Sequence, residues 1–383
     1  MQQTYEVIVV GAGPSGCTLA YELAKAGIQV LVIEKQKLPR YKCCAGGLTA
    51  RAVKALPLEI GDLVEDRVTR IEVQFRDEGH FCGDSDQAFI YTIRRDKFDY
   101  ALARKAEDAG AVILQGQPVL HVDNTSRFVE ITTPENSFRS QFLVGADGAR
   151  SIVARSAGFT NDAVYITGLN AEISVINKEY ARWKGRIFMD IGHIPAGYAW
   201  VFPKSDHVSV GIASIGYAAK KLNHYYTEFL DSLGIKEART IRKSGALIRL
   251  GKGKQQLIMK RTALIGDAAG LADPLSGEGI YNAVQSASLA AASIKECLLR
   301  GVTDLDGYQH AVDEQLMSEI KIARVLQKIF IHFPKVVINI LDFNDNIWKA
   351  CCRFAQGDLN YTLAKQHVGG FKGMRELLQK VMS

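Results

Sequence analysis

The chain has 383 residues, 47% of them hydrophobic and 23% charged, which is the composition of a globular protein able to bury a sizeable core in two or more domains. The N-terminus runs directly into an apolar strand without a basic leader, and no stretch of transmembrane length lacks charges or proline, so we expect a cytoplasmic protein. The seven cysteines include no C-x-x-C pair and no histidine at zinc-ligand spacing. Neither a disulfide framework nor a metal site is therefore expected.

The formal net charge of +6 is informative mainly for its position. Residues 321–383 hold ten Lys and Arg against four Asp and Glu, and the rest of the chain balances at 37 against 37. This basic region is too apolar to be a nucleic-acid-binding segment, so no nucleic-acid partner is expected.

The chain opens with a strand, helix, strand unit. An apolar strand at residues 5–10 leads into a helical pattern at 15–26, Gly27 suits the end of that helix, and a second strand follows at 29–33. Further along, the patterns predict alternating strand and helical segments, namely strands at 68–92, a helix at 96–109, strands up to 144, strands over 167–250 with a helical insertion at 218–233, and helices from 279 onward.

The segment "VIVVGAGPSGCTLAYELAKAGIQVLVIEK" carries a glycine-rich turn between the first strand and the helix. Gly11 permits the tight turn, Gly13 lets the backbone approach a pyrophosphate, and Gly16 lets helix and strand pack closely. Glu34, at the end of the second strand, would accept hydrogen bonds from a ribose diol and repel a 2'-phosphate. Glycines that serve only the turn are the alternative. The pattern predicts FAD or NAD, bound by Gly11, Ala12, Gly13, Pro14, Ser15, Gly16, Glu34 and Lys35.

Two later stretches, "FLVGADGARS" and "TALIGDAAGLADPLSGEGIYNAVQSA", end strands in glycine and aspartate, and Arg95 stands in "IRRDKFD". Together with the first motif they resemble the FAD-binding pattern of the p-hydroxybenzoate hydroxylase class of flavoproteins. The resemblance implies that Asp267 holds the ribityl chain, that backbone amides at 277–280 face the isoalloxazine, and that Arg95 reaches phosphate or ribityl oxygens. Turn, helix-cap and surface-charge roles remain alternatives. The added FAD-binding residues are Arg95, Asp147, Gly148, Asp267, Gly277, Gly279 and Ile280.

"PAGYAWVFPK" places Tyr198, Trp200 and Phe202 at every second position, so an extended chain would project all three rings from one face. Packing on a core is the simplest interpretation of such a run. The stretch nevertheless resembles the P-x-x-Y-x-W-x-F-P signature of the geranylgeranyl reductase family. The resemblance covers about the first 300 residues and implies a flavoenzyme that reduces isolated double bonds of polyprenyl chains.

Reduction of an isolated alkene explains why aromatic residues would be needed. No adjacent carbonyl accepts charge, so hydride from flavin N5 must be accompanied by a proton. Tertiary carbocation character then develops, and aromatic faces stabilise it by about 1–2 kcal/mol per ring in a dry site. We therefore expect Tyr198, Trp200 and Phe202 to bind the substrate chain, with core packing as the alternative.

The family also carries a mobile P-C-G-G-G loop against the flavin, and this chain has "KCCAGGL". Cys43 replaces the proline, Cys44 matches the cysteine, and Ala45 replaces the first glycine, which raises the question of whether an alanine resists the required backbone conformation. The resemblance implies that Cys44, Gly46 and Gly47 are catalytic and that Cys44, Ala45 and Gly46 contact FAD. A structural thiol is the alternative for Cys44.

No second G-x-G-x-x-G offers a dedicated NADPH domain, so an electron donor (NADPH, ferredoxin or a quinol) is expected to dock transiently. The C-terminal region contains a stripe with helical spacing, which predicts either core packing or peripheral contact with the inner face of a membrane. Proline is expected to end that helix at position 334. The stripe residues are Ile322, Val325, Leu326, Ile329, Phe330 and Phe333.

The predicted fold is α/β, a Rossmann-type FAD-binding domain with an inserted β-sheet substrate domain and a helical C-terminal region. The FAD-binding domain is expected at 1–67, 93–165 and 255–300, the β-rich domain at 68–92 and 166–254, and the helical region at 301–383. An aromatic monooxygenase or halogenase of the same fold is the rival enzyme, although no W-x-W-x-I-P halogenase signature is present. A non-catalytic flavin or lipid carrier is the rival outside enzymes.

Overall fold

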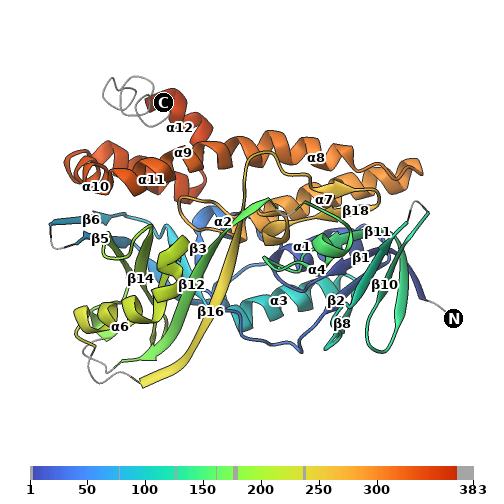
Figure 1. Cartoon of the computed structure of the whole chain (residues 1–383), viewed down its shortest axis with the longest axis horizontal. Coiled ribbons are helices and arrows are strands. Elements are labelled where there is room, and N and C mark those ends of the chain that lie inside the picture. Colours follow the sequence, from blue (N-terminus) through green and yellow to red (C-terminus); the bar gives the residue numbers. More distant parts are fainter. Residues whose placement is uncertain are drawn as a thin grey trace.

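The computed structural model describes residues 3–76, 78–125, 127–160, 162–175, 180–235 and 239–368. Two large sheets lie side by side, and C-terminal helices run along one edge of both (Figure 1). The α/β fold predicted from the sequence is confirmed. The last fifteen residues of the predicted C-terminal helical region lie outside the described residues.

The first sheet has eight strands in the order β17-β18-β11-β1-β2-β8, with β10 on β11 and β9 on β10. Its central strands pair in parallel and are continuous apolar runs, as strands covered on both faces require. The strands are β1 (Gln3–Val10), β2 (Val30–Glu34), β8 (Val112–Gln115), β9 (His121–Asn124), β10 (Val129–Thr132), β11 (Ser137–Gly145), β17 (Ile258–Met259) and β18 (Thr262–Leu264).

Helices pack against this sheet and share its main apolar core. The first of them, α1, begins at Pro14, where a missing N–H costs nothing, and lies between two longer helices. It ends two residues earlier than predicted. The helical elements around this sheet are α1 (Pro14–Ala24), α3 (Arg95–Asp108), α4 (Ile152–Ser156), η3 (Gly266–Ala269), α7 (Ile280–Arg300), α8 (Asp306–Val312) and η4 (Asp313–Met317).

The second sheet has seven strands in the order β16-β12-β15-β14-β13-β5-β6 and is antiparallel except between β13 and β5. Helix α6 packs on β12 and β15 and closes a second core. The elements are β5 (Arg70–Phe75), β6 (Gly79–Asp84), β12 (Ala163–Ser174), β13 (Arg186–Ile191), β14 (Gly197–Pro203), β15 (Val208–Ile215), β16 (Arg239–Gly251), η2 (Gly216–Lys221) and α6 (Leu222–Ser232).

A small three-stranded sheet, in the order β3-β7-β4, lies near α2. It places the residues just after the Cys44 segment beside the strand that precedes α3. Its elements and neighbours are β3 (Gly47–Thr49), β4 (Val64–Val68), β7 (Ile90–Ile93), α2 (Ala50–Ala55) and η1 (Gly61–Leu63).

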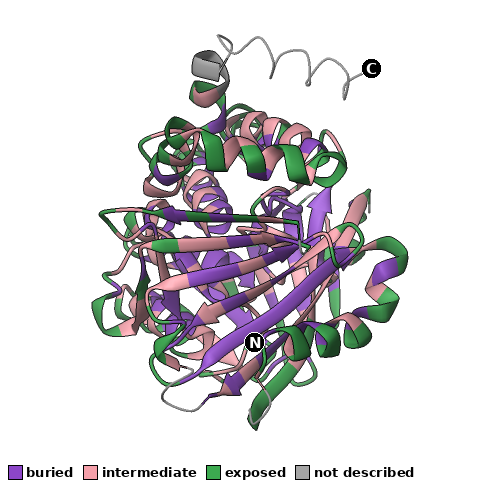
Figure 2. Ribbon diagram, turned by 90° about the vertical axis from the view of Figure 1, so that its left-hand side faces the viewer, coloured by how far each residue is buried: buried purple, intermediate pink, exposed green. Residues whose placement is uncertain are grey.

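The C-terminal helices, here called the roof helices, follow η4. The predicted break at Pro334 is present, since α9 ends at His332 and Pro334 opens the next helix. In Figure 2 the exposed residues gather on the outer side of these helices, while buried residues concentrate in the strands below. The roof helices are α9 (Ser318–His332), α10 (Pro334–Phe343), α11 (Asp345–Gln356) and α12 (Tyr361–Val368).

Candidate active site

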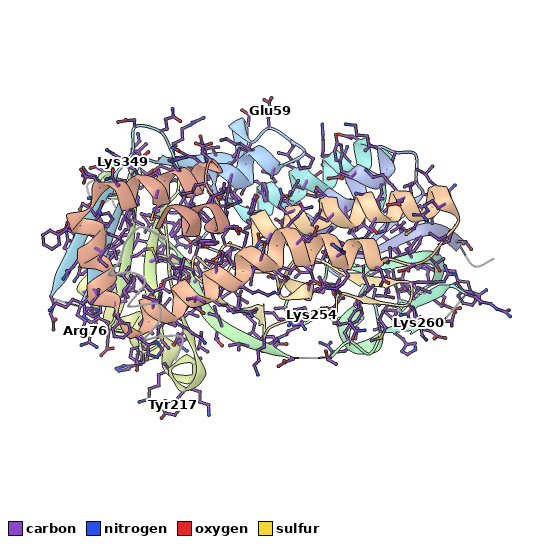
Figure 3. All side chains as sticks on the ribbon, turned by 90° about the horizontal axis from the view of Figure 1, so that it is seen from above. Glu59, Arg76, Tyr217, Lys254, Lys260 and Lys349 are labelled. Carbon is purple, nitrogen blue, oxygen red and sulfur yellow. The ribbon has the colours of Figure 1, made fainter. Side chains whose placement is uncertain are left out.

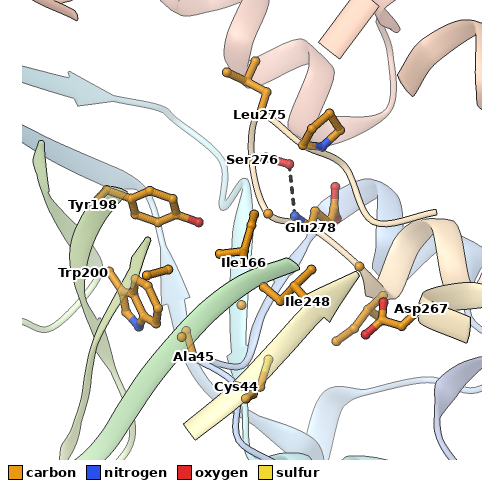
Figure 4. A pocket seen from close by; sticks show the side chains of 18 of the residues that line it. Cys44, Ala45, Ile166, Tyr198, Trp200, Ile248, Asp267, Leu275, Ser276 and Glu278 are labelled. Carbon is orange, nitrogen blue, oxygen red and sulfur yellow. Dashed lines mark hydrogen bonds between the residues drawn. The ribbon is translucent and has the colours of Figure 1, made fainter. Parts of the chain in front are cut away.

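A cavity of about 1850 Å³ lies between the two large sheets and beneath the roof helices. It exceeds the roughly 300–1,000 Å³ of an ordinary ligand pocket, so it has room for more than one ligand. Figure 4 shows its centre, where Tyr198 and Trp200 approach the loop that carries Leu275, Ser276 and Glu278. Every sequence-predicted site residue lines this cavity except Ala12 and Gly16, which pack behind it.

The glycine-rich turn has the close contacts that its sequence predicts. A Cβ at Gly16 would lie 1.9 Å from the carbonyl oxygen of Gly11, so only glycine allows α1 to pack here. At Gly13 a Cβ would meet no atom within 4 Å, which leaves open space beside the start of α1. That helix start has no side-chain cap, and its free N–H groups suit a phosphate.

Glu34 and its neighbours form a buried charged cluster beside this turn. The Glu34 carboxylate accepts hydrogen bonds from the Ala12 amide at 2.9 Å and the Gln36 amide at 3.0 Å. Asp99 lies between two guanidinium groups and accepts from Arg40 at 2.9 Å and from Arg95 at 2.8 and 3.0 Å. The Arg95 side chain is only 10% exposed and lines the cavity, so it is not a surface charge.

Two aspartates, Asp147 and Asp267, line the cavity with their carboxyl groups. Oδ2 of Asp147 accepts from the amides of Ile152 and Val153 and so caps α4, but Oδ1 is buried without a partner among the described residues. Asp267 also lines the cavity, and burial raises the pKa of its carboxyl against the attraction of Lys42 and Arg95. Both carboxyls fit a ligand rich in hydroxyl groups, as the ribityl and ribose parts of FAD are.

The loop before α7 is held rigidly and presents its backbone to the cavity. Oδ1 of Asp273 accepts from the amides of Leu275 and Ser276 at 2.9 and 2.8 Å. Gly277 has φ +70°, a conformation that favours glycine, and Gly279 precedes α7 without a side-chain cap. The positive end of α7 therefore faces the space where a reduced, negatively charged ring system would be stabilised.

Strand β14 presents its three rings to this space, and Tyr198, Trp200 and Phe202 are called the aromatic wall below. The alternate residues Ala199 and Val201 point to the other face and are buried in the core beneath α6. The Tyr198 and Trp200 ring centroids lie 5.6 Å apart, and the indole N–H of Trp200 donates to Asn170 at 3.2 Å.

The Tyr198 hydroxyl approaches the loop before α7. It lies 2.7 Å from the point that a Cβ at Gly277 would occupy. Burial, assisted by the negative charge of Asp273, raises the pKa of Tyr198 to about 12. The phenol is therefore protonated at neutral pH and can donate a hydrogen bond into the cavity.

The Cys44 loop, residues 43–47, forms the floor beside the aromatic wall (Figure 4). The Cys44 thiol accepts from the Gly46 amide at 3.3 Å, and the Cys43 thiol donates to the Ser244 carbonyl at 3.3 Å. Gly46 has φ +73°, whereas Ala45 does not adopt a positive φ. The departure from the family's glycine at Ala45 therefore causes no backbone strain, which answers the question raised by the sequence.

The roof helices contribute residues that the sequence did not assign to the site. Ile322, Val325, Leu326, Ile329 and Phe330 line the cavity, so the stripe faces a ligand space as well as the protein interior. Phe333 follows the end of α9 and is exposed. Lys42 also lines the cavity near Asp267, and burial, reinforced by the charge of Arg95, lowers its pKa. It stands in the quoted "KCCAGGL" segment, so the sequence signal was present.

Comparison with known proteins identifies the family. Residues 4–179 match the FAD binding domain family, and residues 169–248 match the geranylgeranyl reductase catalytic domain. The chain is 30% identical to the chloroplastic geranylgeranyl diphosphate reductase of Nicotiana tabacum, over 85% of this chain and 74% of the relative. This chain belongs to the geranylgeranyl reductase family. It is an FAD-dependent oxidoreductase.

Other similar proteins differ in what their names say they reduce. The menaquinone reductase of Mycobacterium tuberculosis is 30% identical over 75% of each chain. A crystal structure of a geranylgeranyl bacteriochlorophyll reductase-like protein from Thermoplasma acidophilum has a TM-score of 0.79, is 24% identical, and covers 100% of this chain and 96% of its own. Among the described helices, none is both long and apolar enough to cross a bilayer.

Proposed function

We propose that this enzyme reduces isolated carbon-carbon double bonds in a geranylgeranyl or other polyprenyl chain, carried by a lipid, a prenyl diphosphate or a chlorophyll-type molecule. The observation that carries the proposal is one continuous cavity with the nucleotide turn at one end and an apolar space between the aromatic wall and the roof helices at the other. Bound FAD supplies hydride from its N5. An apolar chain gains about 0.8 kcal/mol per buried methylene, which suits this lining.

The residues have separate proposed roles. Asp267, Arg95 and the amides at 277–280 hold the cofactor, while the aromatic wall grips the chain and stabilises positive charge that develops on it. Cys44 lies on the floor near the reacting carbon and positions it or passes a proton. The division into a discontinuous FAD-binding domain, a β-rich substrate domain and a helical C-terminal region remains our proposal for the domains. A transiently docking donor supplies electrons.

Mass spectrometry of the product tests this function. We expect FAD-loaded protein, given a chemical reductant and geranylgeranyl diphosphate, to add two hydrogens for each double bond reduced. Trp200→Leu should keep its FAD and lower the turnover rate by about 5- to 30-fold, the effect of losing one cation–π contact.

Two results would contradict the proposal. An unchanged substrate mass with several prenyl carriers, including a menaquinone, would remove prenyl reduction. Oxygen-dependent hydroxylation or halogenation of an aromatic compound would favour the rival enzymes of this fold. Ala199, on the opposite face of β14, offers a control: Ala199→Gly should leave the wall in place.

We also propose peripheral contact with a membrane through α10. Its inner side, including Val337 and Ile340, lines the cavity, while Val336 and Phe343 are exposed, Phe343 by 85%. Figure 3 looks down on the roof helices and shows Lys349 and Arg76 at the end where α10 and α11 lie. The sequence neighbours Asp342 and Asp345 of Phe343 are acidic, so attraction to anionic lipid must come from basic residues such as Lys349 and Arg76.

Liposome flotation tests this contact. We expect the protein to float with anionic vesicles at low salt, to detach as salt rises, and to bind several-fold more weakly after Phe343→Asp. Leu299 is 88% exposed on α7, away from the roof, and Leu299→Asp is the matched control that should float as before. Equal binding by neutral vesicles, or no flotation at all, would contradict the proposal.

A further inference from the structure

Lys204 directly follows the aromatic wall, and its side chain is buried. It lies in the turn between β14 and β15 with only 2% of its surface exposed. Its amide donates to the carbonyl of His207 at 2.9 Å, and its own carbonyl accepts from the Tyr180 hydroxyl. The backbone on which this lysine stands is therefore fixed on both sides.

The ammonium group of Lys204 clamps the Cys44 loop to the end of β7. Its Nζ donates to the carbonyl of Ala45 at 2.7 Å and to the carbonyl of Ile93 at 2.8 Å. The Ile93 amide in turn donates to the Gly46 carbonyl at 2.7 Å. A Cβ at Gly46 would lie 2.2 Å from the Ile93 carbonyl oxygen and 2.7 Å from Nζ, so only glycine fits under the clamp.

A buried ammonium held only by carbonyl groups is costly. No carboxylate of the described residues lies within ion-pair distance of Lys204, and burial lowers its pKa to about 8. Glu172, the Cys44 thiol and Glu65 favour its charged form, while Arg94 disfavours it. Because an apolar side chain of the same length would avoid this cost, stability alone does not explain a lysine here.

We propose that Lys204 is a positioning residue, which holds the Cys44 loop in place from outside the cavity lining. The loop residues 43–47 line the cavity whereas Lys204 does not, so the lysine acts through the loop and touches no ligand. Strand β14, which ends at Pro203 just before Lys204, carries the aromatic wall. The turn therefore fixes the position of the aromatic wall relative to the Cys44 loop. This inference rests on the proposed role of the Cys44 loop in prenyl reduction.

Thiol labelling tests the clamp without any prenyl substrate. In FAD-loaded Lys204→Met at pH 7, we expect iodoacetamide to alkylate Cys44 about tenfold faster than in the parent, as the loss of two hydrogen bonds would produce. Peptide mass spectrometry resolves Cys44 from the exposed Cys82, whose rate should not change. Lys204→Gln keeps two N–H donors and should give an intermediate rate.

The pH dependence of stability checks the burial of the Lys204 ammonium itself, whereas the labelling rate reports its effect on the loop. With a pKa of about 8 in the folded protein and an ordinary value of 10.5, the unfolded chain binds more protons at Lys204 between these pH values. The parent should therefore gain stability relative to Lys204→Met as pH rises from 8 to 10.5. At pH 7, Lys204→Met should be at least as stable as the parent.

The outcomes separate this inference from the proposed function. Faster labelling without prenyl reduction by the parent leaves the clamp intact and removes the function. Prenyl reduction by the parent with equal Cys44 labelling in both proteins overturns the clamp. Faster labelling at Cys82 as well, or failure of both variants to fold and bind FAD, would show that Lys204 merely supports the core, and this also overturns the proposal.

Discussion

Gly16→Ala is expected to abolish FAD binding and to lower the stability of the FAD-binding sheet. The new methyl group would stand 1.9 Å from the Gly11 carbonyl oxygen and 3.2 Å from the Ala146 side chain, and rigid backbone cannot yield to it. Helix α1 must therefore move away from β1, taking its free N–H groups with it. Overpacking of this kind costs about 1–3 kcal/mol or more. Flavin absorbance after reconstitution and thermal unfolding measure the two effects.

Gly13→Ala is the matched comparison. Gly13 has φ −87°, and a Cβ there meets no protein atom within 4 Å, so the apoprotein should unfold at the parent's temperature. FAD binding should nevertheless weaken at least tenfold, because the methyl group would occupy the space intended for the pyrophosphate. Parent-like FAD affinity in Gly16→Ala would contradict the predicted binding turn, and parent-like affinity in Gly13→Ala would show that the pyrophosphate takes another path.

Breaking the Arg51–Glu278 ion pair should produce the largest loss of stability outside the nucleotide turn. Both side chains are at most 10% exposed, and Glu278 also accepts a hydrogen bond from the Thr49 hydroxyl. The Arg51 guanidinium lies between two aromatic rings, 4.4 Å from the Tyr281 centroid and 4.0 Å from that of Phe354. Glu278→Ala leaves this buried cation unpaired, which costs about 3–5 kcal/mol in the free energy of unfolding.

Denaturant unfolding with two companion variants tests this loss. The pair Glu296 and Arg300 on α7 is exposed by 64% and 67%, and Glu296→Ala should cost less than about 1 kcal/mol. Arg51→Met combined with Glu278→Leu should recover most of the stability, since it removes both charges. Because Phe354 belongs to α11, the single variant should also loosen the roof helices. A Glu278→Ala protein as stable as Glu296→Ala would refute this account.

The features that were predicted most accurately from the sequence are those that depend on residues close together in the chain. The β1, α1, β2 unit and the helix break at Pro334 follow from local periodicity and from proline, and they lie within about two residues of the predicted positions. The alternation in β14 likewise placed three rings on one face. The alternation alone does not tell which face of the strand lines a cavity. The family resemblance supplied that prediction.

The residues that the sequence missed are linked over long distances in the chain. The Lys204 ammonium donates a hydrogen bond to a carbonyl 159 residues away in the chain, and the Thr49 hydroxyl donates one to Glu278, 229 residues away. A lysine or a glutamate in a sequence does not indicate a buried position, because both residue types are usually exposed. The apolar stripe of α9 was visible, but a hydrophobic pattern gives no direction, so it could not distinguish a cavity from a core or a membrane.

The two faces of β14 have a consequence for how such an enzyme changes over generations. Ala199 and Val201 belong to the core beneath α6 on one side, and the aromatic wall lines the cavity on the other. If the wall binds substrate as proposed, substitutions at 198, 200 and 202 would change specificity and leave the core beneath α6 intact, but they would also alter the smaller clusters against which these rings pack. Selection for a new substrate would therefore act mainly on one face of this strand and leave its other face, which packs beneath α6, unchanged.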